Sequence, residues 1–417
     1  HVFSDNIRLR NAFTYRYFND QYMTSELLSV NPVKSPDLVD RSFLYFFHHR
    51  RPLQNQTDFV ASAHTGKIEH QFVAGYDYLH YDNVTDRSSA TGAIVLPSLN
   101  LFNPVDTFTQ RPASFPESRH DYFTHNVSAI YFQDFIRLRE NWSVLASGRY
   151  DHFRRTAFNN PVTNGVESAG AITKIEQDPF TYRLATNYQP LQTLGIYASY
   201  GTSFRPQTAV STDGKQLNPE TGQQFEIGQR ISLPSNRLSL NLSWFRIVKE
   251  NVTVSRPGGI LDQAGRVRSK GFEADLRGRV TSRLNVRASY GYTQAQYDDF
   301  ASRDGDGIIK SLAGNTPAFV PRHTTSFWGI YDLTREWRVA VGQRYIGRSP
   351  TNNFNYIMMG GYTTWDAAVF YHRSKAEYAL NMSNILNKER YLVSAINDTL
   401  VYPGKPFEIT GSIRFHF

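Results

Sequence analysis

The last eleven residues, 407–417, alternate strictly between apolar and polar side chains. One parity carries Phe407, Ile409, Gly411, Ile413, Phe415 and Phe417, and the other carries Glu408, Thr410, Ser412, Arg414 and His416. Because successive side chains of a β-strand point to opposite faces, this segment is predicted to be a strand with one apolar face and one charged face. The apolar face would fill the core of a soluble sandwich, or contact lipid in a transmembrane barrel whose polar face lines a wet lumen.

The composition excludes a helical membrane protein but permits a transmembrane barrel. Aromatic residues make up 14% of the 417 residues, yet the mean hydropathy is only −0.47. No run approaches the ~20 consecutive apolar residues that a membrane-spanning helix needs. A barrel strand requires an apolar residue only at every second position, so its signal is weaker. The chain has no cysteine, which excludes disulfides and thiolate metal ligands.

The net charge of +8 does not indicate a nucleic-acid partner. Lysine and arginine are scattered singly through alternating segments, with no basic arm, zinc-finger spacing or recognition helix. We therefore expect the positive charge to lie on a wet lumen and on outer loops, where it favours anionic ligands or lipopolysaccharide phosphates.

Short and long connections alternate along the chain. The short ones are Thr65–Lys67, Arg139–Asn141, Leu191–Thr193, Pro234–Asn236, Thr281–Arg283, Arg335–Glu336 and Arg373–Lys375. The long ones are predicted at Asn83–Arg119, Asn159–Gln177, Arg205–Glu220, Pro257–Gly265, Asp299–Val320, Ser349–Gly360 and Asn387–Pro403. Transmembrane barrels show this asymmetry, with short periplasmic turns and long extracellular loops.

The segments between these connections keep the two-face pattern. Leu238, Leu240, Leu242 and Trp244 share one parity, and charged residues recur in the middle of the 272–277 segment. Such charges are costly in a protein core but inexpensive on a lumen face, where they pair across strands. The fold is predicted to be all-β, an antiparallel transmembrane β-barrel with about 16 strands over one domain, residues 1–417. Residues 6–64 divide least clearly.

No catalytic or metal-binding motif stands out, so we predict that the protein is not an enzyme and has no cofactor. Asp304-Gly305-Asp306-Gly307 lacks the further oxygen ligands of a calcium loop and is interpreted as a turn. His48 and His49 would point to opposite faces of a strand, which is poor geometry for a shared metal. There is no Gly-x-Ser-x-Gly elbow, phosphate-binding glycine loop or His-Glu-x-x-His motif.

Aromatic, arginine and asparagine residues in the long connections are the best candidates for ligand binding. We select Tyr81, Phe102, Arg205, Tyr356 and Tyr391. Such side chains stack on a bulky organic ligand and hydrogen-bond it at a barrel mouth. The alternative for each residue is packing within its own loop.

Several segments resemble the barrel of TonB-dependent siderophore receptors, most closely the ferrichrome (ferric hydroxamate) branch. They are, in order, Leu99–Val105, Ile130–Asp134, Gly148–Asp151, Tyr197–Gln207, Asn218–Gly228, Lys270–Ala274, Gly314–Pro317, Val320–His323 and Asn384–Tyr391. The terminal Phe417, preceded by alternating aromatics, is similar to the assembly signal of bacterial outer-membrane proteins.

The resemblance implies a monomeric receptor in the bacterial outer membrane that imports a ferric siderophore. Iron enters only as part of that ligand. The other partners implied are outer-membrane lipid and lipopolysaccharide, together with the TonB complex, which pulls on a plug domain through an N-terminal segment. Family members carry that plug and about 22 strands. We find neither a plug nor the first strands and no leader before His1, so we expect a fragment of a receptor.

Two other functions remain open from the sequence. A passive porin-like channel is possible because an even number of strands can close without a plug. A soluble all-β enzyme would express without detergent, which the alternation of apolar and polar residues argues against.

Overall fold

The computed structural model describes residues 1–30, 37–88, 98–100, 102–105, 119–163, 165–211, 214–233, 237–255, 261–304, 306–389, 392–395 and 401–415. All its regular elements are β-strands, which confirms the predicted all-β class. In these residues no helix has the length and apolar character needed to cross a membrane.

The strands are long in the first half of the chain and shorter toward its end. The first eleven are β1 (Val2–Ser4), β2 (Ile7–Tyr15), β3 (Phe18–Val30), β4 (Leu38–Thr65), β5 (Ile68–Ser88), β6 (Leu99–Asn100), β7 (Arg119–Arg139), β8 (Trp142–Thr163), β9 (Val166–Glu167), β10 (Ile172–Gln177) and β11 (Phe180–Leu191). They are followed by β12 (Leu194–Arg205), β13 (Glu220–Ser232), β14 (Leu238–Ser255), β15 (Leu261–Arg279), β16 (Leu284–Asp299), β17 (Ala301–Arg303), β18 (Ile309–Ser311) and β19 (His323–Asp332). The last are β20 (Trp337–Ile346), β21 (Ser349–Pro350), β22 (Met358–Met359), β23 (Tyr362–Arg373), β24 (Ala376–Ser383), β25 (Leu392–Ala395), β26 (Val401–Pro403) and β27 (Glu408–Phe415).

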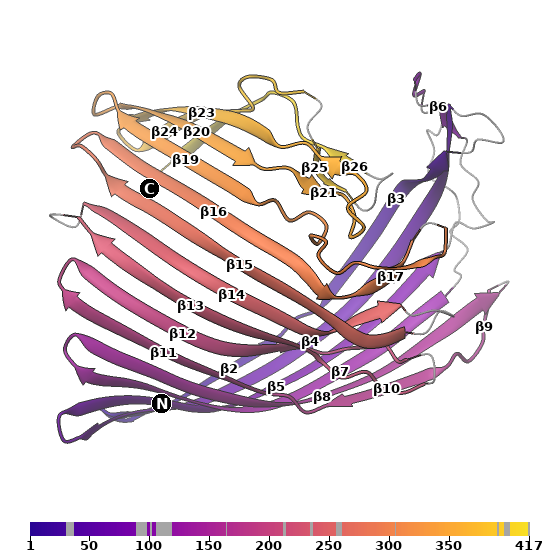
Figure 1. The fold of residues 1–417 in the computed structure, drawn as a ribbon, viewed down its shortest axis with the longest axis horizontal. Helices are drawn as coiled ribbons and strands as arrows, with labels where there is room; N and C mark the ends of the chain where they lie inside the picture. Colours follow the sequence, from indigo (N-terminus) through magenta and orange to yellow (C-terminus); the bar gives the residue numbers. More distant parts are fainter. Residues whose placement is uncertain are drawn as a thin grey trace. The chain divides into compact units, whose positions relative to one another are not determined.

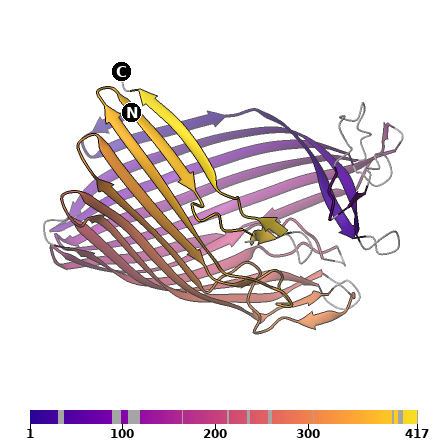
Figure 2. The ribbon, with the colours of Figure 1, turned by 90° about the horizontal axis from the view of Figure 1, so that it is seen from above.

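The chain divides into two compact units. The first contains residues 1–63, 71–134 and 147–181, and the second contains 64–70, 135–146 and 182–417. In the second unit each long strand pairs antiparallel with the next, from β12 through β16, β19, β20, β23 and β24 to β27. Its short turns lie at one end of these strands, and β17, β21, β25 and β26 lie at the other (Figures 1 and 2).

The register of the second unit produces the two predicted faces. Leu240 of β14 pairs with Leu276 of β15, and the next residue, Asn241, pairs with Asp275. Because paired residues project to the same side, leucines continue across neighbouring strands on one side and polar residues on the other. We call these two sides the apolar face and the polar face of the unit.

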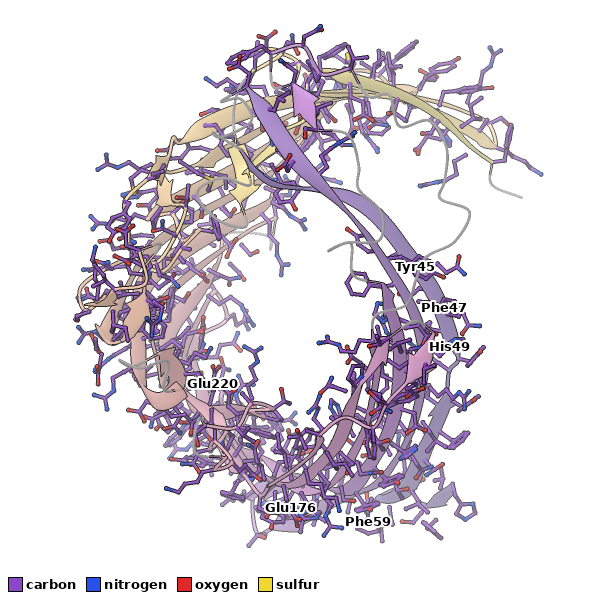
Figure 3. All side chains as sticks on the ribbon, turned by 90° about the vertical axis from the view of Figure 1, so that its right-hand side faces the viewer. Tyr45, Phe47, His49, Phe59, Glu176 and Glu220 are labelled. Carbon is purple, nitrogen blue, oxygen red and sulfur yellow. The ribbon has the colours of Figure 1, made fainter. Side chains whose placement is uncertain are left out.

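The long strand β4 has the same alternation in the first unit. Tyr45, Phe47, His49 and Phe59 share one parity (Figure 3), and Phe59 is 44% exposed. Asp58, of the opposite parity, is only 2% exposed because neighbouring polar side chains cover it. The side that carries Asp58 is the polar face of this unit.

The number of long strands agrees with the predicted value of about 16. β2 and β3 pair with successive parts of β4, and β10 and β11 with successive parts of β8, so each couple counts as one interrupted strand. The set within the described residues is then β2/β3, β4, β5, β7, β8, β10/β11, β12, β13, β14, β15, β16, β19, β20, β23, β24 and β27.

Several predicted long connections are wrong in extent, because strand structure continues into them. Residues 159–177 hold the end of β8, all of β9 and β10, while β17 pairs with β18 within residues 299–320. Residues 349–360 contain the pair β21–β22, and 387–403 the pair β25–β26. The turn-forming residues correctly predict that these regions connect long strands. Short hairpins nevertheless form between the turns.

The closing segment forms β27, whose apolar parity lies in register with that of β24. Ile413 pairs with Tyr378, and Arg414 pairs with Glu377, the closest approach of its guanidinium to that carboxylate being 4.0 Å. The predicted faces of this strand are therefore confirmed up to Phe415. His416 and Phe417 lie outside the described residues.

The two faces of β14 should respond differently to an added positive charge. Leu242→Arg places a guanidinium on the apolar face, which we expect to contact lipid, and should destabilise the folded state by about 2–4 kcal/mol. Ser243→Arg, which faces Glu273 across the strands, should change stability by less than about 1 kcal/mol. Denaturant unfolding in lipid vesicles measures both; equal effects of the two substitutions would contradict the assignment of faces.

Candidate functional site

A hydrogen-bonded network joins charged residues on the polar face of the first unit. Arg149 donates to Asp151 at 2.9 Å and to Asp77 at 3.2 Å, and its guanidinium lies 5.7 Å from the centre of the Tyr131 ring. The Tyr131 hydroxyl donates in turn to Asp58. These charges are satisfied by one another across strands β4, β5, β7 and β8, so the network stabilises the wall.

An aromatic cluster lies further along the same face, toward the long connections. Tyr81 of β5 is 5.8 Å from Phe123 of β7 between ring centres, and His125 is 4.9 Å from Phe123 and 5.3 Å from Phe153 of β8. The Arg155 guanidinium lies over Phe123 at 5.3 Å. An aromatic surface with an adjacent cation binds flat, electron-rich or anionic organic groups well.

Arg205 lies beside a buried acid in the second unit. It stands opposite Glu220 in the β12–β13 register, with 3.9 Å between its Nη1 and the carboxylate, which is too long for a hydrogen bond. Lys249 of β14 approaches the same carboxylate to 2.5 Å, and Gln207 donates to it at 3.0 Å. The Glu220 side chain is 8% exposed, whereas that of Arg205 is 75% exposed. Glu220 (Figure 3) is therefore held by Lys249 and Gln207, and the nearby Arg205 guanidinium stays open to solvent.

Tyr356 is fixed by a lysine from the preceding long connection. The Lys310 ammonium donates to the Tyr356 hydroxyl at 2.9 Å and pairs with Asp304 at 2.7 Å. Asp304 also accepts from the backbone N–H groups of Asp306 and Ile308, so its carboxylate closes the β17–β18 turn. The hydrogen bond from Lys310 lowers the pKa of Asp304. Asp304 thus stabilises a turn, in agreement with the interpretation of residues 304–307 as a turn.

Asparagine side chains bind these two long connections to each other. The Asn355 side chain accepts from the N–H of Thr316 at 2.9 Å and donates to the carbonyl of Thr316 at 2.7 Å. Asn315 donates to the carbonyl of Asn353 at 3.1 Å, and Ala318 donates from its backbone to the Asn353 side chain at 3.0 Å. Tyr356, which is 59% exposed, is therefore presented by a hydrogen-bonded pair of loops.

The predicted ligand residues are divided between the two units. Tyr81 belongs to the aromatic cluster of the first unit, and Phe102 is 83% exposed beside a turn capped by the Asn100 side chain. Arg205 and Tyr356 lie in the second unit, and Tyr391 lies outside the described residues. No hydrogen bond, ion pair or ring contact joins any two of the five within the part of the chain that is described.

Sequence reasoning missed the partners of these residues. Phe123, His125, Phe153 and Arg155 were overlooked, as were Glu220, Lys249 and Lys310. For the first group a signal existed, because aromatic residues occupy the parity that elsewhere in the strands is polar. No sequence signal linked Lys310 to Tyr356, since 46 residues separate them.

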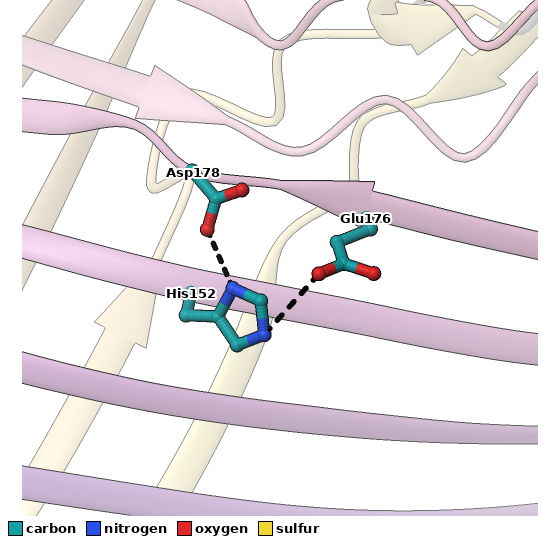
Figure 4. A group of neighbouring side chains, drawn as sticks. All are labelled: His152, Glu176 and Asp178. Carbon is teal, nitrogen blue, oxygen red and sulfur yellow. Dashed lines mark hydrogen bonds and ion pairs between the residues drawn. The ribbon is translucent and has the colours of Figure 1, made fainter.

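One group of described side chains has the composition of a metal site. His152 lies 2.5 Å from Asp178 through Nδ1 and 3.5 Å from Glu176 through Nε2 (Figure 4). Tyr150 donates to Asp178 at 3.1 Å and Arg154 to Glu176 at 3.3 Å, so both carboxylates already have protein partners. The simplest interpretation is a set of cross-strand polar pairs.

His48 and His49 do not share a site. His48 Nδ1 contacts the Thr85 hydroxyl at 2.9 Å, and His49 Nδ1 contacts Asn19 Oδ1 at 2.7 Å. The His48 ring stacks on Phe46, whereas the His49 ring meets Phe47 edge to face. The prediction that they point to opposite faces of a strand is confirmed.

Comparison with known proteins gives consistent results. A family model described as TonB dependent receptor-like, beta-barrel matches residues 1–385. The metal-pseudopaline receptor CntO of Pseudomonas aeruginosa (strain UCBPP-PA14) is 27% identical over 376 residues, which cover 87% of this chain and 51% of CntO. The ferrichrome outer membrane transporter/phage receptor of Escherichia coli (strain K12) is 28% identical over 385 residues, which cover 88% of this chain and 49% of that receptor. The chain thus spans about half the length of these curated relatives.

Two solved structures illustrate the fold that this chain shares. The siderophore receptor PiuA from Acinetobacter baumannii matches with a TM-score of 0.87 at 21% identity, covering 100% of this chain and 63% of that one. The closed form of the ferric-catecholate import receptor Fiu from Escherichia coli K12 matches with a TM-score of 0.85 at 19% identity, covering 100% and 63%. At such identities the likeness concerns the fold alone.

The Asn355 side chain should determine how well ordered the two connections around Tyr356 are. Asn355→Ala removes the two hydrogen bonds to Thr316, so backbone amides in 312–318 and 350–357 should exchange with solvent at least about tenfold faster. Hydrogen exchange followed by mass spectrometry measures this. Ser302→Ala, in the neighbouring hairpin, is the control and should leave exchange unchanged; unaltered exchange in Asn355→Ala would disprove the role.

Acid should open the β17–β18 hairpin. Because the folded-state pKa of Asp304 lies below its usual value of 3.8, the ion pair contributes fully above that pH and is lost as the pH falls through the folded value. The protection factors of amides in residues 301–311, taken relative to intrinsic exchange at each pH, should therefore fall below about pH 4 in the native protein. Asp304→Asn should show fast exchange at neutral pH and no acid transition; a transition that persists would assign it to another group.

Proposed function

Because the chain belongs to the TonB-dependent receptor-like β-barrel family, we propose that it forms the wall of a receptor for metal–chelator complexes. Proteins of this family are located in the bacterial outer membrane and are receptors and transporters, not enzymes. Residues 1–417 would form a single barrel domain, with the polar faces toward the lumen and the apolar faces toward lipid.

The single observation that supports ligand binding best is the exposed Arg205 guanidinium beside the buried Glu220. Because the guanidinium is open to solvent and makes no hydrogen bond to the acid, its donors are available to a ligand. Arg205 offers a planar fork of donors to carboxylate or hydroxamate oxygens at the surface of a chelate. Tyr356, fixed by Lys310, would add a stacking surface, and Tyr81 with its aromatic cluster would do so on the wall of the first unit.

The relatives and these side chains support a proposal for the chemical class of the ligand. Relatives are named as receptors for ferrichrome, for ferrioxamine and for metal-pseudopaline. We infer a ferric siderophore of the hydroxamate type as the first choice. An anionic metallophore is the second, since exposed guanidinium groups favour negative charge.

The partners follow from the same proposal. Import would require a plug domain and the TonB complex, which acts through an N-terminal region outside residues 1–417. We propose that the receptor works as a monomer, because each barrel of this kind encloses its own lumen. Phe102 and Tyr391 remain candidate contact residues on the long connections.

Ligand binding by the protein in outer-membrane vesicles tests the site. Arg205→Ala and Tyr356→Ala should each weaken binding of ferrichrome by about tenfold, equivalent to about 1.4 kcal/mol, measured by quenching of tryptophan fluorescence. Tyr81→Ala should have a similar effect. Arg137→Ala is the control, because Arg137 pairs with Glu69 at the short-turn end of the strands.

Three further outcomes are informative. Unchanged binding in Arg205→Ala and Tyr356→Ala together would refute the site while leaving the receptor function open. Arg205-dependent binding of a ferric carboxylate chelate, without binding of ferrichrome, would select the second ligand class. High single-channel conductance without any chelate binding would favour a passive porin-like channel, because a plugged importer conducts little.

A further inference from the structure

Charged side chains gather on the apolar face of the first unit. His152 of β8 has the same parity as Tyr150 and Phe158, which are 42% and 36% exposed. Asp151 and Phe153, of the opposite parity, are buried on the polar face. His152 and the two carboxylates that it contacts therefore lie on the apolar face. Charges on such a face are unfavourable in lipid, so the group requires electrostatic compensation.

The strand that lies beside β8 is interrupted at one of these carboxylates. β10 ends at Gln177, and its register with β8 places the next residue, Asp178, opposite His152. Pro179 follows, which disfavours a helical backbone at Asp178 and cannot donate to the ladder. The N–H of Asp151 donates to the Pro179 carbonyl at 3.1 Å, so the register is kept across the break between β10 and β11. The backbone thus holds Asp178 beside His152.

The two ring nitrogens of His152 face different carboxylates (Figure 4). Nδ1 lies 2.5 Å from Asp178, and because an ionised carboxylate can only accept, this nitrogen carries the proton. In the neutral imidazole Nε2 is then an acceptor, and it lies 3.5 Å from a carboxylate oxygen of Glu176. Two acceptors that face each other repel, so this arrangement is stabilised by a second ring proton or by a metal ion between them.

The separation of these two atoms suits a metal ion. Zinc binds histidine nitrogen and carboxylate oxygen at about 2.0–2.2 Å, so two ligand atoms of a tetrahedral ion lie about 3.4 Å apart. The 3.5 Å between His152 Nε2 and Glu176 is close to that value. The hydrogen bond from Nδ1–H to Asp178 fixes the tautomer and the ring plane, as carboxylates do for metal-binding histidines. Within the described residues, no other group of three histidine and acidic side chains has its ligand atoms within 4.8 Å of one another.

The group is open to an ion from solution. The side chains of His152, Glu176 and Asp178 are 29%, 54% and 45% exposed. Arg154 donates to Glu176 at 3.3 Å, but both partners are exposed, and ion pairs of that kind contribute little to stability. A metal ion can therefore displace the guanidinium from the carboxylate. The cross-strand polar pairs are the metal-free arrangement of this group.

We propose that His152 and Glu176 bind a divalent transition-metal ion, with water completing its coordination and Asp178 orienting the imidazole. One nitrogen and one carboxylate favour an ion such as Zn²⁺ over Ca²⁺ and Mg²⁺, which prefer oxygen ligands. The ion joins β8 to β10 beside the break, where Pro179 leaves the ladder without a donor. The site lies on the face opposite to that of Tyr81 and its aromatic cluster, so it is independent of the proposed import ligand.

Zinc binding to the purified protein in detergent micelles tests the proposal. Isothermal titration calorimetry measures the affinity, and carbethoxylation of histidines followed by mass spectrometry identifies the ring that Zn²⁺ protects. Zn²⁺ should protect His152. His152→Gln and Glu176→Gln should each weaken binding by at least about tenfold, because each removes a ligand. Asp178→Ala should also weaken it, and Asp178→Asn should restore part of the affinity, because the amide oxygen still accepts from Nδ1–H.

Arg154→Gln separates a metal site from a purely structural set of ion pairs. The substitution removes the cation that competes for Glu176, so Zn²⁺ should bind severalfold more tightly. His80→Gln is the matched control, because His80 has the parity of the exposed Tyr76 and contacts one carboxylate, Asp82, at 3.1 Å. Its zinc affinity should equal that of the wild type.

Two results would overturn the proposal. One is the absence of His152 protection by Zn²⁺ in both the wild type and Arg154→Gln, which would leave a ring proton as the only cation between Nε2 and Glu176. The other is a loss of zinc affinity in His80→Gln equal to that in His152→Gln, which would indicate unspecific binding to surface histidines. If His152→Gln does not fold, Glu176→Gln answers the question, because the exposed glutamine keeps the shape of the side chain.

Discussion

The antiparallel backbone ladder is the constraint on which every other feature of this structure depends. It fixes which residues stand opposite each other, and a slip of one residue would exchange the apolar and polar faces of a whole strand. From β12 to β16 the register continues over four strand pairs without a shift, except near the long-connection ends of β14 and β15. Whether a residue is at an odd or an even position therefore decides which face of the sheet its side chain occupies.

The same ladder explains how the polar faces contain both structural and functional groups. Charges near the short-turn side, such as Arg149 and Asp151, are satisfied by each other and leave little capacity for a ligand. Toward the long connections the pattern changes, because aromatic rings or exposed cations occupy the polar parity. Phe153 and Arg205 are examples. Aromatic rings and exposed cations on the polar parity thus become more frequent along the strands in the direction of the longer loops.

This distribution also shows what a sequence can and cannot predict. The two faces, the short turns and the strand number follow from a period of two, which is visible in residues such as Leu238–Trp244. The contacts that shape the sites do not, because they join residues far apart, as Lys310 and Tyr356 or Asn355 and Thr316 do. The hairpins inside the long connections were not predicted, because their strands are short and are separated by turn-forming residues. Arg205 was recognised, but the buried acid beside it was not.

Exposed cations at the long-connection end of the second unit have two different environments. Arg205 occupies the polar face and lies beside Glu220, so its charge is partly compensated before a ligand arrives. Arg322 and Arg348 border a cleft with no carboxylate in its lining, at strand ends where His323 and Tyr345 carry the apolar parity. Arg205 lies within the ladder and has a counter-charge on the opposed strand, whereas Arg322 and Arg348 lie just beyond the ends of β19 and β20. The strand pairing therefore supplies a partner for the first cation and none for the other two within the described residues.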